Sequence, residues 1–309
     1  MHIPRYDIIL LANNITGRTN ELSGLIFNAL CNKKIYDRNE LVTNNSKIIK
    51  TICRFGESYG QPESVDAMIN CRKAGYNAMR VDLQCTTDGT FVLWHDPCLN
   101  QYYKNVYIGS TLVEYSPENN IRISNTNYSI LNQYKYGDVK YASGIPTLEN
   151  ILKAARMVGF DIYLECKMIL TNDQISKLIS MINYYGMIKN VSIAAFNKEN
   201  AIKISEFNSN IRVGIRNDAF NEEVKNTFIT LKNNSNKVFW FGWSTMELTD
   251  TIVNFLSENG IEFECGDFYS YGDIDKYFST SINNYCTGIE LQGKMIPLTS
   301  EHFKQSYIK

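Results

Sequence analysis

Residues 79–96 read MRVDLQCTTDGTFVLWHD, two short runs of alternating apolar residues joined by a turn. In the first run the apolar side chains alternate with polar ones: Met79, Val81 and Leu83 share one side, and Arg80, Asp82 and Gln84 share the other. This period of two predicts a strand with one apolar face and one polar face. A strand is an unfavourable place for Arg80 and Asp82 unless their face lines a site, so the strand is a candidate wall of a functional site.

The turn and the second run complete a predicted hairpin. Asp88-Gly89 supplies the turn, because glycine tolerates positive φ and aspartate bonds to nearby backbone. Phe91–Trp94 is the second strand, and it delivers His95 at its C-terminal end. The alternative interpretation of the same pattern is a solvent-exposed hairpin in which the histidine is incidental.

Length and composition limit the classes of protein to which the chain can belong. The chain has 309 residues, 44% of them hydrophobic, which suits one large domain or two small ones, and α/β barrels commonly reach this size undivided. The formal net charge is -1, so no global field favours nucleic acid or an anionic membrane. The 20 tyrosines and 15 phenylalanines are scattered and do not cluster with basic residues as a base-stacking platform would. Nucleic acid is therefore not an expected partner.

The 8 cysteines include no C-x-x-C pair, and several fall inside apolar, strand-like runs. They are interpreted as buried free thiols of a reducing compartment, although their even number leaves disulfides open. No run resembles a secretory signal or approaches the length of a membrane span. The expectation is a cytoplasmic protein without an integral membrane segment, and the oligomeric state does not follow from the sequence.

The chain is expected to divide at residue 47. Residues 1–47 are interpreted as an N-terminal extension with an amphipathic segment at Asn20–Lys33 and a polar linker at Asp37–Lys47. From residue 48 onward, strands alternate with helices of about 10–15 residues, which implies parallel pairing through right-handed crossovers. Residues 100–143 are rich in Tyr, Asn and Ser and weakly periodic, which suggests an irregular insertion after the third strand.

The strand-like segments predict an α/β fold, a (β/α)8 barrel at residues 48–309. Nine segments are recognised: 48–53, 79–84, 91–94, 161–167, 190–196, 211–215, 237–242, 261–265 and 285–291. Eight of them suffice to close a barrel, which leaves one spare. The first helix is expected to open at Pro62, because proline is favoured in the first turn.

In such a barrel the functional residues come from the C-terminal ends of the strands and from the loops that follow. Charged or titratable side chains occupy those positions here: Arg54, Arg80, Asp82, His95, Glu165 and Lys167. Any one of them alone is equally well explained as a surface charge or a structural ion pair. Their convergence by strand order favours a site.

Several motifs resemble the glycerophosphodiester phosphodiesterase family, from about Ile48 to the C-terminus. They are Pro62-Glu63-Ser64 after a Gly-containing loop, the block 75–84 followed by Thr87-Asp88-Gly89, Val92–Pro97 with Leu99, Ile145-Pro146-Thr147-Leu148, and Leu164-Glu165-Cys166-Lys167. The order of T-x-D-G, H-D, IPTL and L-E-x-K is specific. The resemblance implies a (β/α)8 barrel with an insertion after the third strand, in agreement with the strand pattern.

The resemblance also implies a chemistry, the hydrolysis of a glycerophosphodiester to glycerol 3-phosphate and an alcohol. The family uses two histidines as acid and base, and a divalent metal held by carboxylates as a Lewis acid. Its metal ligands belong to an E-x-D pattern on the second strand and to the Glu of L-E-x-K, and its first histidine belongs to an H-R-G motif. By this resemblance His95 is a catalytic residue, and Asp82 and Glu165 are the metal ligands.

The sequence departs from the family pattern inside the site. The E-x-D position reads Arg80-Val81-Asp82, so the first carboxylate is replaced by a cation. The H-R-G position reads Cys53-Arg54-Phe55-Gly56, where either Arg54 or, after a shift of one residue, Cys53 falls on the histidine. The chain's other histidines are His2 and His302, near its ends, and the family's W-T-x-N feature is also missing.

Three hypotheses remain open. The first is conventional catalysis with Mg²⁺ or Ca²⁺ at Asp82 and Glu165. Arg80 opposes it, because two like charges at about 4 Å repel by roughly 4 kcal/mol at an effective dielectric near 20. In the second, the arginine replaces the metal, as in the related bacterial phosphatidylinositol-specific phospholipases C. The third is a non-catalytic member in which Arg80 pairs with Asp82 or Glu165 and fills the former metal site.

Under the second hypothesis a small phosphodiester is the expected ligand and no cofactor is needed. Arg80 clamps the phosphate with Arg54 or Lys167, since a guanidinium can hold a phosphate bidentately. His95, Arg54 and Lys167 are then the predicted catalytic residues, and Arg80 and Glu63 the predicted substrate-binding residues. The second acid–base group, which replaces the family's first histidine as partner of His95, is Asp82, Glu63 or Cys53.

Overall fold

The computed structural model describes residues 41–292 except for 43–47, 100, 102, 104, 115, 117–119, 138–142, 218, 244–247, 281 and 283–284. The amphipathic segment predicted at Asn20–Lys33 lies outside the described residues, as do His2 and His302. Within the predicted linker, β1 (Leu41–Val42) pairs antiparallel with the start of β2 (Ile48–Arg54).

Eight parallel strands close into a barrel, as the alternation of strands and helices predicted. In order around the ring they are β2 (Ile48–Arg54), β3 (Ala78–Cys85), β9 (Asp161–Cys166), β10 (Val191–Ala195), β11 (Arg212–Arg216), β12 (Val238–Trp243), β13 (Glu262–Phe268) and β14 (Cys286–Leu291). Pairing of β14 with β2 and of β2 with β3 closes the ring. The (β/α)8 prediction is confirmed.

The spare strand is the second strand of the predicted hairpin. β4 (Phe91–Leu93) pairs antiparallel with β3, with Leu83 opposite Leu93 and Cys85 opposite Phe91. Gly89 at the turn has φ +73°, a left-handed conformation that glycine adopts without strain. The hairpin is therefore confirmed, and His95 follows a strand that lies outside the barrel wall.

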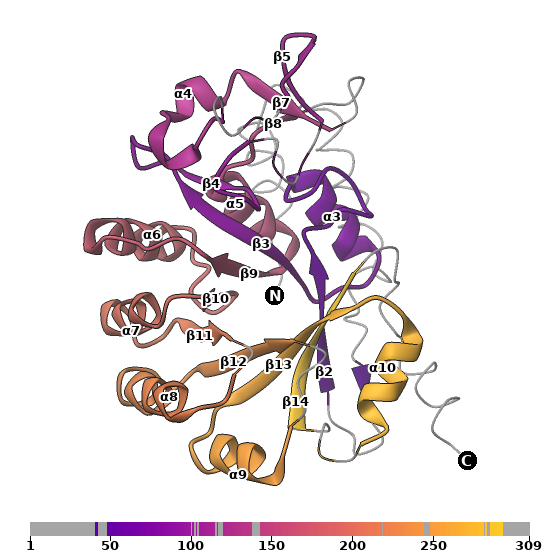
Figure 1. Ribbon diagram of the computed structural model, residues 1–309, viewed down its shortest axis with the longest axis vertical. Coiled ribbons are helices and arrows are strands. Elements are labelled where there is room, and N and C mark those ends of the chain that lie inside the picture. Colours follow the sequence, from indigo (N-terminus) through magenta and orange to yellow (C-terminus); the bar gives the residue numbers. More distant parts are fainter. Residues whose placement is uncertain are drawn as a thin grey trace.

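Helices pack against the outside of the barrel, and Figure 1 shows four of them, α6 to α9, stacked along one side. The helices that lead into barrel strands are α3 (Val65–Lys73), α5 (Leu148–Val158), α6 (Asn172–Tyr184), α7 (Lys198–Phe207), α8 (Glu222–Asn234), α9 (Asp250–Glu258) and α10 (Tyr271–Phe278). Six begin at a Ser, Thr or Asn whose side chain accepts a first-turn backbone N–H: Ser64, Thr147, Thr171, Asn197, Asn221 and Thr249. These caps satisfy backbone donors that the helix itself cannot.

The first helix begins later than its proline suggested. α3 starts at Val65 with Ser64 as its cap, so Pro62 lies before the helix and not in its first turn. The reason is the backbone of Glu63, whose φ of +62° is left-handed and incompatible with a right-handed helix at this residue.

Below the mouth, the interior of the barrel is filled by a small cluster of apolar side chains. Its members are Ile52, Ala78, Tyr163, Ala194, Phe239 and Phe241, all nearly inaccessible to solvent. Gly214 on β11 leaves room beside this cluster, because a Cβ there would overlap the carbonyl oxygen of Phe239 on β12. The cluster fills the barrel interior beneath the charged side chains of the mouth.

The insertion is more regular than the sequence suggested. It contains a small antiparallel sheet of β5 (Val106–Ile108), β6 (Thr111–Leu112), β7 (Tyr134–Tyr136) and β8 (Ser143–Gly144), with η2 (Ile123–Asn125) and α4 (Tyr128–Leu131). Trp94, just after β4, contacts the rings of Tyr103 and Tyr136 at centroid distances of 4.7 and 4.9 Å. These aromatic side chains give the insertion a core of its own, which sits above β3 and β4 in Figure 1.

The cysteine prediction holds for the cysteines that the structure describes. These are Cys53, Cys71, Cys85, Cys98, Cys166, Cys265 and Cys286, and each is a buried free thiol. In the described part of the chain, none of the helices has the length and apolar character needed to cross a membrane.

Candidate active site

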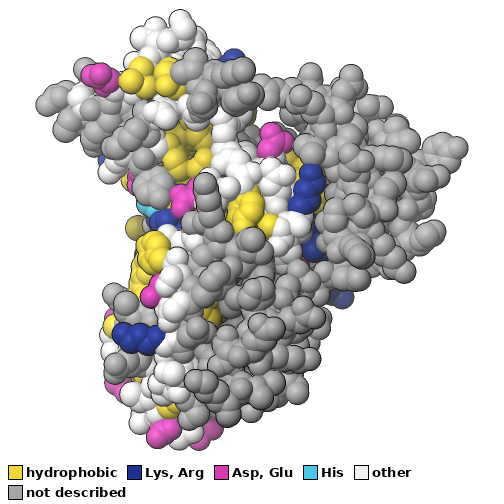
Figure 2. Space-filling view, turned by 90° about the vertical axis from the view of Figure 1, so that its right-hand side faces the viewer, with side chains coloured by type: hydrophobic (Ala, Val, Ile, Leu, Met, Phe, Trp, Pro, Cys, Tyr) yellow, Lys and Arg dark blue, Asp and Glu magenta, His cyan; other side chains and the backbone are white. Residues whose placement is uncertain are grey.

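The C-terminal end of β3 forms one wall of the site, as the quoted stretch predicted. Parallel pairing places Arg80 beside Arg54 of β2, and Asp82 beside Glu165 of β9. Arg80, Asp82 and Glu165 are each at most 3% exposed, because they point into the barrel mouth and not outward. Figure 2 shows a histidine side chain, in cyan, at the surface beside basic and acidic side chains, with hydrophobic side chains nearby.

Arg80 lies between two carboxylates. Its Nη1 forms an ion pair with Glu165, and its Nε lies 2.8 Å from Oε1 of Glu290 on β14. Burial raises the pKa of Glu290 to about 8 in spite of Arg80. Burial also opposes ionisation of Glu165, but the charges of Arg80, Arg216 and Lys167 outweigh it and hold its pKa below the ordinary value.

The positive charge of Arg80 opposes a divalent cation at this site. Arg80 pairs with Glu165, one of the two carboxylates that the family pattern assigns to metal binding. Among the residues that the structure describes, no group of three His, Cys, Asp or Glu side chains is arranged to hold a metal ion. The guanidinium already supplies the positive charge that these carboxylates require.

A second group of side chains lies at the exposed edge of the same site. Nε2 of His95 is 4.0 Å from Oδ2 of Asp82, and Nζ of Lys167 is 3.4 Å from the same oxygen. His95 and Lys167 are 20% and 28% exposed, so a ligand can reach both, whereas Asp82 is almost completely buried. Burial, and then the neighbouring Glu165, raise the pKa of Asp82 to about 6.

His95 is oriented from its other side. Its Nδ1 lies 2.8 Å from Oδ1 of Asp96, and its ring packs edge-on against Phe55 at 5.3 Å. A neutral imidazole that donates Nδ1–H to Asp96 keeps a lone pair on Nε2, the nitrogen that faces Asp82. The pair of His95 and Asp82 therefore combines an exposed proton acceptor with a carboxyl that titrates near neutral pH.

Arg54 is the third cation at the mouth. Its Nη1 donates to Oε1 of Gln292 at 3.2 Å, and its guanidinium lies 4.3 Å from the centre of the Phe55 ring. Arg80 approaches the same ring at 4.7 Å. The ring of Phe55 therefore contacts both guanidinium groups.

Glu63 lies deeper than a substrate-binding role suggests. It is completely buried and accepts a hydrogen bond from the Tyr103 hydroxyl at 3.0 Å, which links the barrel to the insertion. Burial and the charge of Asp82 raise the pKa of Glu63 well above the ordinary value. Cys53, the other candidate base, is also buried.

The sequence pattern missed two acidic residues and one arginine of this layer. Glu290 and Asp267 extend from β14 and β13, and Arg216 ends β11. The strands that carry them were predicted, and alternation along each strand could have found the inward side chains. No local motif marked them, because the features compared with the family lie mostly before residue 170.

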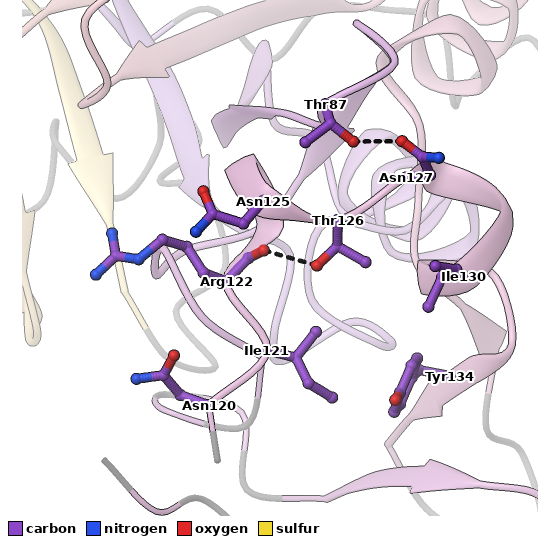
Figure 3. Close-up of a pocket in the computed structure, with 9 residues that line it drawn as sticks. All are labelled: Thr87, Asn120, Ile121, Arg122, Asn125, Thr126, Asn127, Ile130 and Tyr134. Atoms are coloured by element: carbon purple, nitrogen blue, oxygen red, sulfur yellow. Dashed lines mark hydrogen bonds between the residues drawn. The ribbon is translucent and has the colours of Figure 1, made fainter. Parts of the chain in front are cut away.

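A separate pocket lies between the hairpin turn and the insertion (Figure 3). It encloses about 550 Å³ and is lined by Thr87, Asn120, Ile121, Arg122, Asn125, Thr126, Asn127, Ile130 and Tyr134. Thr87 donates a hydrogen bond to Asn127 across it, and Thr126 donates to the Arg122 carbonyl oxygen at 2.8 Å. Among the described residues, its lining contains no carboxylate, imidazole or thiol, in contrast to the barrel mouth.

Comparisons with known proteins agree with the fold and with the motifs. The model of the glycerophosphoryl diester phosphodiesterase family matches residues 56–245. No curated protein matches the chain.

Solved structures with the same fold include three from bacteria. A putative glycerophosphoryl diester phosphodiesterase from Silicibacter pomeroyi is 12% identical, covers 79% of this chain and 89% of its own, and has a TM-score of 0.66. A glycerophosphodiester phosphodiesterase from Agrobacterium tumefaciens is 13% identical, with 83% and 99% covered and a TM-score of 0.60. A phosphodiesterase from Oleispira antarctica, solved with the product sn-glycerol-3-phosphate, is 13% identical, with 78% and 92% covered and a TM-score of 0.63.

Proposed function

Since this chain belongs to the glycerophosphoryl diester phosphodiesterase family, we propose that it hydrolyses glycerophosphodiesters at the barrel mouth, with Arg80 in place of a metal ion. The observation that carries this proposal is the position of Arg80 between Glu165 and Glu290. The products are glycerol 3-phosphate and an alcohol. Glycerol 3-phosphate is also the molecule bound in the related Oleispira antarctica structure.

Positive charge at the site favours a phosphodiester anion without a bound metal. Lys167 is a partly exposed cation, and its Nζ lies 3.4 Å from Asp82 and 3.9 Å from Glu165. A phosphate oxygen beside Lys167 would also lie close to Nε2 of His95, because both groups face Oδ2 of Asp82. Such charges stabilise the phosphoryl group while its bonds to oxygen change.

Hydrolysis needs a group that takes a proton from the attacking water and a group that gives a proton to the leaving alcohol oxygen. Water attacks phosphorus, the bond to the alcohol oxygen breaks, and the two proton transfers balance. His95 and Asp82 are the two groups proposed for these transfers. Asp82 is preferred over Glu63 and Cys53 because it lies near both exposed groups of the site, whereas Glu63 is completely buried and accepts a hydrogen bond from Tyr103.

A second candidate function is phosphate binding without catalysis. The ion pair of Arg80 with Glu165 favours it, because that pair was expected if the former metal site had become a structural feature. The same geometry therefore supports both functions, and they differ in whether His95 transfers protons.

The deciding experiment is an assay for glycerol 3-phosphate release from glycerophosphocholine, with bis(p-nitrophenyl) phosphate as a second substrate. Wild type and His95→Ala are compared in the presence of EDTA, and Lys189→Ala on the far side of the barrel is the matched control. Hydrolysis by wild type and the control, lost in His95→Ala, supports catalysis. Equal background rates in all three leave only phosphate binding.

Calorimetric titration of wild type with Mg²⁺, Ca²⁺ and Mn²⁺ tests the proposed role of Arg80 separately. No heat of binding is expected, because Arg80 pairs with Glu165 and its charge repels a cation at this site. Tight binding of any of the three ions would remove the proposal that Arg80 stands in for a metal.

A further inference from the structure

Arg216 is the least satisfied charged group of the barrel mouth. It is 2% exposed, and none of its three guanidinium nitrogens has a hydrogen-bond partner among the described residues. Its nearest carboxylate is Asp267, with Oδ2 at 3.8 Å from Nη2, which is beyond hydrogen-bonding distance. A buried cation in this condition is destabilising unless something outside the fold completes its hydrogen bonds.

Among the described residues, two aromatic rings pack against this guanidinium. Its central carbon lies 4.2 Å from the centre of the Phe241 ring and 3.9 Å from that of Trp243. Both rings belong to β12, next to β11, and Phe241 lies opposite Arg216 in the register. Contacts with aromatic faces orient a guanidinium while leaving its N–H groups available in its plane.

Arg216 belongs to the same charged layer as the proposed catalytic groups. Burial lowers its pKa, and the charges of Glu165, Arg80, Glu290 and Asp267 all act on it. Arg80 is engaged by two carboxylates, so it has less capacity than Arg216 to accept a new anion.

We propose that Arg216 is an anion-binding residue whose hydrogen-bond partner is the phosphate group of the ligand. This inference rests on the proposed function, because it names the group that receives the phosphate. Two N–H groups of one guanidinium can bind two phosphate oxygens at once. The ring of Trp243, which is only partly buried, lies over the guanidinium, so a ligand bound there would contact the indole.

The same strand offers a matched control. Arg212, four residues earlier on β11, also lies among charged groups, but at the opposite end of the barrel, and its side chain is 11% exposed. Its nitrogens donate to Tyr163 at 3.1 Å, Ser192 at 3.1 Å, and Glu264 at 2.9 Å, with Glu262 also in contact. Arg212 therefore stabilises the fold through bonds that the protein itself provides.

The test compares Arg216→Met with Arg212→Met. Thermal unfolding without ligand is expected to show Arg216→Met as stable as wild type or more stable, because it removes an unsatisfied buried charge. Arg212→Met is expected to unfold at a lower temperature, because it leaves Glu264 buried without its partner. If Arg212→Met does not fold, Arg212→Lys replaces it in the comparison.

Binding is then measured by calorimetry with sn-glycerol 3-phosphate and with inorganic phosphate. Wild type and the Arg212 variant are expected to bind, Arg216→Met to bind at least tenfold more weakly, and Arg216→Lys to be intermediate because lysine keeps the charge but not the bidentate geometry. Quenching or enhancement of tryptophan fluorescence on binding is expected in wild type and not in Trp243→Phe.

The outcomes separate the two proposals. If wild type binds the phosphates and Arg216→Met binds them equally well, the role of Arg216 is wrong and the proposed function stands. If Arg216→Met unfolds or loses as much stability as Arg212→Met, Arg216 is a structural residue and the inference fails. If wild type binds neither phosphate, the proposed function fails at the level of the ligand, and the inference fails with it.

Discussion

Replacing Arg80 with methionine tests how the charges of the site are balanced. The substitution keeps a long side chain but leaves Glu165 and Glu290 buried without the guanidinium between them. Because the pKa of Glu290 is already about 8, that residue is mostly neutral at pH 7, and Glu165 is the carboxylate that loses its counter-charge. Removing one partner of a buried pair costs about 3–5 kcal/mol, so the free energy of unfolding should fall by that amount at pH 7.

The loss of stability in Arg80→Met is expected to change with pH, in a direction that follows from the pKa of Glu165. In wild type the pKa of Glu165 is lowered, so its stabilising contribution is present above the unfolded pKa and is lost as pH falls through the folded value. In Arg80→Met the unpaired carboxyl is expected to have a raised pKa and to take up a proton near neutral pH. The deficit of the variant should therefore be largest at pH 8 and should shrink toward pH 5.

Urea unfolding of wild type and Arg80→Met at pH 5, 7 and 8 measures the deficit. The matched control is the double variant Arg80→Met/Glu165→Gln, which should recover part of the lost stability because the unpaired charge is gone. A free energy of unfolding for Arg80→Met within about 1 kcal/mol of the wild-type value at all three pH values would refute the reasoning. A buried carboxylate without its partner should lower the stability by more than that.

Three further predictions follow from single contacts. Asp82→Asn should be more stable than wild type at pH 7 by up to about 3 kcal/mol. The reason is that folding raises the pKa of Asp82 to about 6, so the wild-type protein loses stability as pH rises between about 4 and 6. Thermal unfolding at pH 4.5 and 7 checks this, and an equal difference between the two proteins at both pH values contradicts it. Tyr103→Phe removes the hydroxyl that donates to buried Glu63 and should lower the free energy of urea unfolding by about 1–3 kcal/mol, whereas an unchanged midpoint would mean that Glu63 finds another donor. Gly214→Ala should cost about 1–3 kcal/mol or more, because its Cβ meets the Phe239 carbonyl oxygen; a variant as stable as wild type would show that β11 can shift.

Local pattern was sufficient to predict the barrel. Each strand has a distinct apolar run and most helices begin after a capping residue, such as Thr171 before α6, so the alternation could be followed without knowledge of the pairing. The pattern could not show that β4 lies outside the wall, because an antiparallel hairpin strand and a parallel barrel strand have the same local alternation. It also missed the sheet of the insertion, whose strands are only two or three residues long.

The site was predictable where charged residues stand close to a recognised motif. Arg80, Asp82, Glu165, His95 and Lys167 lie together as the strand order implied. Glu290 and Arg216 are also inward residues at strand ends, but their significance depends on partners on other strands, Arg80 for Glu290 and Asp267 for Arg216, which a local pattern does not contain. Glu63 was assigned to the substrate from its motif, whereas the structure places its carboxyl against Tyr103.

Arg80 stands where the family pattern has a glutamate and a metal ion, and this replacement leaves the net charge of the site unchanged. In the pattern implied by the family resemblance, a divalent cation and the first Glu of E-x-D together contribute a charge of +1, and Arg80 alone contributes the same. The remaining ligands of that pattern, Asp82 and Glu165, are both present and buried beside the arginine. A phosphodiester therefore meets a similar electrostatic environment in either arrangement. Under the proposed function, an arginine cannot lower the pKa of a bound water as a metal ion does, so activation of the attacking water falls to side chains of the site. The proposed chemical difference between the chain and the family pattern then lies at His95 and Asp82, the two groups that face one another at the open edge of the site.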